Sequence, residues 1–206
     1  MQSSEARRKV IISIALRRQK PGSGSSIEIL RGRTYIMRFP NLQDILAGLP
    51  WCIVGAAATR MYMPERFTAD LDIAILPENA QEVANRLTQA GFRRKQDLTI
   101  GGSCWESPDG FPVDLIEVRE NWWPRALVEA SNNLDAQGLP IAPLPYLVLM
   151  KFQSGRVQDL ADVSRMLGIA SSEQLEAVRA VFAEHEPEGA DDLESLIILG
   201  KLETPS

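Results

Sequence analysis

Cysteine, histidine and long apolar runs are scarce in this chain of 206 residues. Two cysteines, Cys52 and Cys104, are too few for the disulfide framework of a small secreted protein, and they favour a reducing, cytoplasmic location. The one histidine, His185, provides no cluster for a zinc or histidine-ligated iron site. No apolar run approaches the roughly 18 residues that a membrane-spanning helix needs. With 45% hydrophobic and 24% charged residues, the composition instead indicates a soluble globular protein.

Charge is distributed unevenly along the chain. Residues 1–38 carry nine Lys and Arg against two acidic residues, whereas the rest of the chain carries 13 basic and 25 acidic residues. The acidic body argues against a broad nucleic-acid groove, while the basic segment is expected either to contact phosphate or to be a solvated tail. An export signal is not expected, because the apolar stretch 10–16 is short and Arg17 and Arg18 follow it.

Periodicity predicts an α+β (mixed α/β) fold: a small mixed sheet flanked by helices, followed by a helical C-terminal part. We expect a basic arm with a Gly/Ser linker at 1–26, a mixed domain at 27–140 and a helical region at 141–206. Strands are predicted at 27–30, 34–39, 51–54, 71–76, 98–105 and 111–118, the last two joined by the hairpin turn 107–110. Helices are predicted at 41–49, 56–61, 77–90, 147–152, 157–167, 172–184 and 191–199.

Two carboxylates stand side by side at the start of a predicted strand. Asp70 and Asp72 are separated by one residue, so both point to the same face of the strand. A third, Asp114, lies among apolar residues of a later strand, and if the two strands pair, the three carboxylates converge. Such a cluster suits hard divalent cations, Mg²⁺ or Mn²⁺, which serve phosphoryl and nucleotidyl transfer. A lone acid-x-acid pair is also common as a solvated strand end, so its context matters.

That context is a strand, a glycine and a turn of small residues. The strand 51–54 leads through Gly55 into Ala56, a junction that offers backbone N–H groups to an anion. Arg66 and Thr68 come just before the paired acids. A phosphate-binding turn, a cation and a metal-binding pair are therefore predicted within one short segment.

These motifs together resemble those of a known family. Val54-Gly55-Ala56, the stretch 66–73 and Val113-Asp114-Leu115 are similar to the pattern of the nucleotidyltransferase superfamily, which shares the polymerase-beta-like fold. The stretches 144–151 and 155–162 resemble the helical segment of AbiEii-type toxin nucleotidyltransferases. The resemblance covers about residues 41–168, and it implies that the 27–140 domain is catalytic.

The resemblance also implies a role for each matching residue. Asp70, Asp72 and Asp114 would hold the metal ions, and Asp114 would also help to deprotonate the attacking hydroxyl. Nucleotide binding would fall to five residues: Gly55, Ala56, Arg66, Thr68 and Lys151. Ala56 departs from the family pattern, which usually has a second Gly or a Ser there, so no side-chain hydroxyl is available to a phosphate.

The function implied is transfer of an NMP from an NTP to a hydroxyl acceptor, with Mg²⁺ or Mn²⁺ as cofactor. The acceptor would be RNA, especially tRNA, or a protein, and the enzyme would be a toxin controlled by a cognate antitoxin. Two alternatives remain open. One is a small-molecule (antibiotic) nucleotidyltransferase, and the other is a non-catalytic nucleotide- or partner-binding module, which Ala56 and the lack of a basic groove on the body would favour.

Several residues near these motifs also have ordinary structural interpretations. Lys151 ends an apolar helical turn and could simply extend to solvent. Asp159 and Asp162 are expected to brace the helical region by pairing with nearby arginines. The tryptophan pair at 122–123 is expected to be a hydrophobic anchor, and both cysteines are expected to be small core residues.

Overall fold

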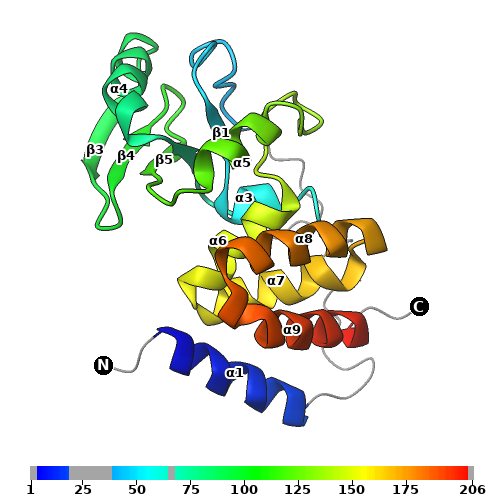
Figure 1. Cartoon of the computed structure of the whole chain (residues 1–206). Helices are drawn as coiled ribbons and strands as arrows, with labels where there is room; N and C mark the ends of the chain where they lie inside the picture. The colour runs from blue at the N-terminus through cyan, green and yellow to red at the C-terminus, as the bar shows by residue number, and fades with distance from the viewer. Residues whose placement is uncertain (1–3, 19–38, 65–67, 204–206) are drawn as a thin grey trace. The chain divides into compact units, whose positions relative to one another are not determined.

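The computed structural model describes residues 4–18, 39–64 and 68–203 (Figure 1). The strands expected at 27–30 and 34–39, the Gly/Ser linker and Arg66 lie outside the described residues, apart from Phe39. The chain divides into two compact units. We call residues 35–61 and 66–143 the sheet unit, and residues 1–34, 62–65 and 144–206 the helical unit.

The sheet unit is built on five strands in the order β1-β2-β5-β4-β3. β2 and β5 run parallel, and every other neighbouring pair is antiparallel, so the sheet is mixed as expected. The strands are β1 (Trp51–Ile53), β2 (Leu71–Ile75), β3 (Arg93–Asp97), β4 (Gly102–Glu106) and β5 (Pro112–Glu117). The predicted hairpin between β4 and β5 is present, and its turn is closed by a hydrogen bond from Ser107 N to Phe111 O (2.9 Å).

Apolar side chains from β1, β2 and β5 form the centre of this unit. The three residues of β1 are buried, and so are Leu71, Ile73 and Ile75 of β2. Helix α4 (Ala80–Gln89), preceded by the 3-10 turn Pro77–Asn79, contributes buried Val83 and Leu87. Helix α3 (Gly55–Thr59) packs against β2, and α5 (Trp123–Ala130) packs against β1.

Two predictions for the sheet unit were wrong in their details. The strand expected at 98–105 starts only at Gly102, because residues 98–101 form the turn that joins it to β3. The helix expected at 41–49 is a series of turns, in which Leu42 and Leu46 are nonetheless fully buried. The tryptophan pair is an anchor as expected: Trp122 and Trp123 are buried and stacked, with ring centroids 4.6 Å apart.

The helical unit consists of packed helices. They are α1 (Ser4–Arg18), α6 (Leu144–Ser154), α7 (Val157–Ile169), α8 (Ser172–His185) and α9 (Ala190–Glu203), with the 3-10 turn Pro187–Gly189 before α9. α7 and α9 touch backbone to backbone, since a Cβ on Gly200 would lie 1.9 Å from the carbonyl oxygen of Ser164. The start of α8 has a capping box that its sequence encodes locally, with Ser171 and Gln174 bonded reciprocally.

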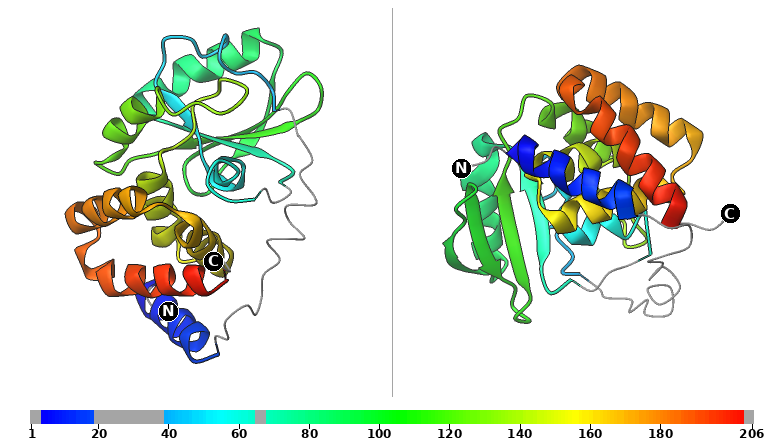
Figure 2. Two further views of the ribbon diagram at one scale, coloured as in Figure 1. Left: turned by 90° about the vertical axis from the view of Figure 1, so that its right-hand side faces the viewer. Right: turned by 90° about the horizontal axis from the view of Figure 1, so that it is seen from below.

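The N-terminal segment differs from the expected arm, because residues 4–18 form helix α1, which lies beside α9 in both views of Figure 2. Arg8 is only 4% exposed and donates from Nε to Asp192 Oδ2 at 3.0 Å. Its guanidinium also lies 3.9 Å from the centre of the Phe152 ring. This part of the basic segment therefore belongs to the helical unit and is not a solvated tail.

Candidate active site

Asp70, Asp72 and Asp114 come together at one face of the sheet. β2 and β5 pair in parallel with Asp72 opposite Asp114, and this pairing is the one on which the predicted convergence depended. Each aspartate offers an oxygen, and the three oxygens lie within 4.8 Å of one another. All three side chains are half-buried, which leaves them accessible to a ligand.

Thr68 holds the first of these carboxylates. Its hydroxyl donates to Asp70 Oδ1 at 2.7 Å and lies 3.3 Å from the Asp70 carbonyl oxygen. The Thr68 side chain is buried, so this hydrogen bond is shielded from water. The hydroxyl is thus engaged with Asp70, which orients the carboxylate at the point where β2 begins.

Gly55 lies directly against the second carboxylate. Its φ is +63°, a conformation that favours glycine, and a Cβ built on it would lie 1.8 Å from Asp72 Oδ2. The preceding residue is tied to the same place, because Val54 N donates to Asp72 O at 2.9 Å. The end of β1 therefore depends on glycine to leave room for the Asp72 carboxylate.

Cys104 lies beside the third carboxylate, and the sequence analysis missed it. It is half-buried rather than a core residue, and it pairs with Asp114 across β4 and β5. Burial raises the pKa of its thiol to about 11, and the nearby negative charges of Asp114 and Asp70 act in the same direction. Counting outward from the turn at 107–110 would have paired these two residues from sequence alone.

The other expected nucleotide-binding residues are placed less directly. Ala56 is half-buried in α3, and its carbonyl oxygen accepts a hydrogen bond from the Thr59 hydroxyl at 2.7 Å. Arg66 lies outside the described residues. Lys151 belongs to α6 of the helical unit, so its role toward the acidic cluster stays a prediction.

Within the helical unit, Lys151 is buried and does not extend to solvent. Its ammonium lies 2.8 Å from Asp159 Oδ1 and 3.0 Å from Asp162 Oδ2. Asp159 also accepts from Ser154 Oγ and from Arg156 Nε, both at 2.6 Å. Burial alone would raise the pKa of Asp159, but Lys151, Ser154 and Arg156 together lower it. Asp159 and Asp162 therefore brace α6 and α7, as expected, but mainly through Lys151.

The donor set of the acidic cluster fits a hard divalent cation. Three carboxylates supply only oxygen ligands, the chemistry that Mg²⁺ and Mn²⁺ prefer. Holding three negative charges within 4.8 Å is costly in isolation, so the arrangement favours binding of a cation. The three strands that carry the aspartates and Cys104 place these groups before any ligand arrives.

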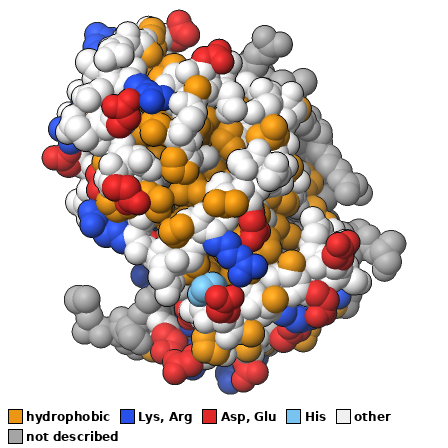
Figure 3. Space-filling model, turned by 45° about the horizontal axis from the view of Figure 1, so that its top comes forward, with side chains coloured by type: hydrophobic (Ala, Val, Ile, Leu, Met, Phe, Trp, Pro, Cys, Tyr) orange, Lys and Arg blue, Asp and Glu red, His pale blue; other side chains and the backbone are white. Residues whose placement is uncertain are grey.

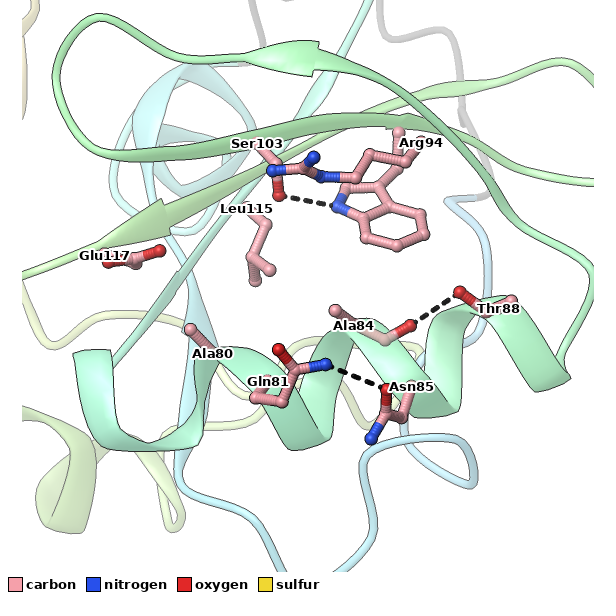
Figure 4. Close-up of a pocket in the computed structure, with 10 residues that line it drawn as sticks. Ala80, Gln81, Ala84, Asn85, Thr88, Arg94, Ser103, Leu115 and Glu117 are labelled. Atoms are coloured by element: carbon pink, nitrogen blue, oxygen red, sulfur yellow. Dashed lines mark hydrogen bonds between the residues drawn. The ribbon is translucent and has the colours of Figure 1, made fainter.

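A groove of about 410 Å³ lies on the opposite face of the sheet, between α4 and β3, β4 and β5 (Figure 4). Leu115, Ser103 and Trp105 face this groove, and they alternate along their strands with Asp114 and Cys104. The groove and the acidic cluster are therefore on different faces of the same strands.

Basic side chains are dispersed on the surface shown in Figure 3. Among the described residues of that face, Lys and Arg are interspersed with acidic and hydrophobic side chains rather than gathered into one basic patch. None of the helices in the described part of the chain has the length and apolar character needed to cross a membrane.

The comparisons with known proteins find similar solved structures at low sequence identity. No protein-family model matches the sequence, and neither does any curated protein. A crystal structure of ANT(2")-Ia in complex with adenylyl-2"-tobramycin is 20% identical in sequence, with a TM-score of 0.43. The match covers 78% of this chain and 94% of the ANT(2")-Ia chain. A solution structure of ANT(2'')-Ia is 16% identical in sequence, with a TM-score of 0.44. The match covers 98% of this chain and 93% of the other chain.

A third similar structure comes from a trypanosome. Terminal uridylyl transferase 4 from Trypanosoma brucei with bound GTP is 12% identical, with a TM-score of 0.32. The match covers 81% of this chain and 57% of the trypanosomal chain.

Proposed function

We propose that this protein is a metal-dependent nucleotidyltransferase that moves an NMP from an NTP to a hydroxyl acceptor. The observation that supports this is the cluster of Asp70, Asp72 and Asp114 on neighbouring parallel strands. Two carboxylates from the start of one strand and a third from the next are suited to a pair of divalent cations that act in in-line displacement.

The three carboxylates have distinct roles in this proposal. Asp70 and Asp72 would hold Mg²⁺ or Mn²⁺, and Asp114 would complete the site and accept the proton of the acceptor hydroxyl. Metal ions held there would supply positive charge to the triphosphate and to the transition state. As the acceptor oxygen bonds to the α-phosphorus, the bond from that phosphorus to the bridging oxygen breaks and pyrophosphate leaves.

Residues around the cluster would orient the nucleotide. Gly55 and Ala56 carry no bulky side chain, so we place the triphosphate against their main chain, and the nucleotide-binding role of Arg66 stays a prediction. Thr68 acts on the nucleotide indirectly, since its hydroxyl is engaged with Asp70. For Lys151 to neutralise phosphate charge, its ammonium would have to share or leave the two carboxylates that it now contacts.

For the acceptor, we propose a hydroxyl of RNA, tRNA in particular, or of a protein. The resemblance of residues 144–162 to toxin nucleotidyltransferases supports this, and it makes a cognate antitoxin the expected partner. A small-molecule antibiotic is the alternative acceptor, and ANT(2")-Ia, whose structure contains adenylyl-2"-tobramycin, acts on that class.

A transfer assay tests the proposal. The full chain is incubated with Mg²⁺ or Mn²⁺, each of four labelled NTPs, and total RNA, cell lysate or an aminoglycoside. Label on RNA, protein or drug is expected, and Asp72→Asn should abolish it. Glu82→Gln is the matched control, because it removes one exposed carboxylate from α4 and should retain full activity.

The outcomes separate the alternatives by substrate turnover. Label that appears with the wild-type chain and persists in Asp72→Asn would contradict the assignment of the site. Binding of NTP and Mn²⁺ without any labelled product would favour the non-catalytic module.

A further inference from the structure

We propose that Cys104 is a positioning residue that holds the Asp114 carboxylate from the neighbouring strand. This inference rests on the proposed function, because it assigns Asp114 a role at the metal site. Cys104 lies within the range of the resemblance, about residues 41–168, but belongs to none of the motifs that carry it.

The strand register brings Cys104 to the face that carries the acids. In the antiparallel β4–β5 pair, Cys104 is directly opposite Asp114, and paired residues point to the same face. The two neighbours of Cys104 point the other way, and both are nearly fully buried: Ser103 is 6% exposed and Trp105 is 2% exposed. The Trp105 indole donates from Nε1 to Ser103 Oγ at 2.8 Å, which fixes this part of β4 (Figure 4).

The thiol supplies Asp114 with a hydrogen-bond donor. Cys104 lies directly opposite Asp114 across the strand pair, which places its S–H beside a carboxylate whose two oxygens together accept up to about four hydrogen bonds or metal contacts. One donor therefore orients the group and still leaves oxygen lone pairs for a cation. A thiol is a weak donor, so it holds the carboxylate without competing strongly with a metal ion.

A similar arrangement supports the first carboxylate of the cluster. Thr68 donates to Asp70 Oδ1, and Cys104 lies directly opposite Asp114, so each outer carboxylate has a neighbour from outside the acidic cluster. In the central position, Gly55 leaves the space that the Asp72 carboxylate occupies. The cluster is thus held by three different residues, and Cys104 is the one that the sequence motifs do not include.

Calorimetric titration of the full chain with Mn²⁺ tests this role. Cys104→Ala is expected to weaken Mn²⁺ binding by about three- to tenfold, the effect of losing one weak hydrogen bond to a charged group. Cys104→Ser retains a donor and should restore the affinity to within about twofold of wild type. If transfer is observed, kcat at saturating Mn²⁺ should stay within about twofold in both variants, because Cys104 does not touch the reacting atoms.

A second variant separates this role from general stability. Ser103→Ala changes the adjacent residue on the same strand, removes the hydrogen bond from Trp105, and faces away from the acids. It should lower the denaturation midpoint without changing Mn²⁺ affinity. Mn²⁺ affinity that is unchanged in Cys104→Ala, or equally weak in Cys104→Ala and Cys104→Ser, would overturn the proposal for Cys104.

The same titration distinguishes this inference from the proposed function. Mn²⁺ binding without nucleotidyl transfer would refute the enzyme assignment while the comparison of the Cys104 variants still stands. A wild-type chain that binds no Mn²⁺ would overturn both.

Discussion

The contact between Gly55 and Asp72 predicts a large and specific effect for Gly55→Ala. Gly55 has φ +63°, and for an alanine this conformation costs about 1–2 kcal/mol. The added Cβ would also lie 1.8 Å from Asp72 Oδ2, so the carboxylate or the end of β1 must move. Overpacking of this kind costs about 1–3 kcal/mol. The predicted loss in free energy of unfolding is therefore about 2–5 kcal/mol, with a loss of Mn²⁺ affinity as Asp72 is displaced.

Gly48 provides the matched control. Its φ is +78°, but nothing lies within 4 Å of a Cβ built on it. Gly48→Ala should therefore show only the conformational cost, about 1–2 kcal/mol, and should leave Mn²⁺ affinity unchanged. The difference between the two variants isolates the steric contact with Asp72.

Tryptophan fluorescence in urea provides the assay. All four tryptophans of the chain, at positions 51, 105, 122 and 123, lie in the sheet unit, so their emission reports unfolding of that unit. Combining Gly55→Ala with Asp72→Ala should relieve part of the cost, because the nearest remaining Asp72 atom would be Cβ, at 3.0 Å. Equal losses in Gly55→Ala and Gly48→Ala would refute the steric reasoning.

Three further predictions concern the helical unit, where far-UV circular dichroism follows unfolding. Lys151→Met removes the cation that buried Asp159 and Asp162 share, leaving Asp159 with Arg156 alone, and should cost about 3–5 kcal/mol. The exposed-site control Lys201→Met should cost less than about 0.5 kcal/mol, and equal losses would contradict this prediction. The pKa of Asp159 is lower in the folded protein than in the unfolded chain, so its ionised carboxylate stabilises the fold above the unfolded pKa of about 3.9, and this contribution is lost as pH falls through the folded pKa. Wild type and Asp159→Asn should therefore converge in free energy of unfolding from pH 6 to pH 3. A constant difference between them would refute the assignment. Arg8→Ala should loosen α1 and speed tryptic cleavage within it, whereas Arg7→Ala, at an exposed site, should not. If Arg8→Ala resists trypsin as well as wild type does, the buried contact of Arg8 does not stabilise α1.

The sequence predicted best those elements whose signal is local. β1 is a continuous apolar run, β2 and β5 are apolar apart from their acidic residues, and the capping motif at Ser171 lies within four residues of its partner. The acid pair Asp70 and Asp72 is equally local, because alternation along one strand puts both on one face. The sequence did not predict that β2 pairs with β5, because this pairing joins residues more than 40 positions apart, so the convergence of Asp114 with the acid pair stayed a condition.

The features that were missed depend on distant partners or on exposure. β3 consists of charged and polar residues, all exposed, so no alternation of apolar residues marks it. Arg8 is buried because Asp192, 184 residues away, neutralises it, and no local pattern shows this. The Lys151 ammonium was expected to reach solvent or to bind phosphate. Its partners are instead Asp159 and Asp162, the i, i+3 pair of aspartates that follows it in the sequence.

The composition of β3 also has a consequence for how copies of this chain meet. A strand at the edge of a sheet exposes unpaired N–H and C=O groups, to which the edge of another molecule can bind. Here that edge carries Arg93, Arg94 and Lys95 against Asp97 and against Glu106 of β4, so it keeps a small net positive charge that repels a second copy. Salt shortens the range of this repulsion from about 10 Å at 0.1 M to about 3 Å at 1 M. The protection against edge-to-edge association is therefore electrostatic, and it weakens as ionic strength rises.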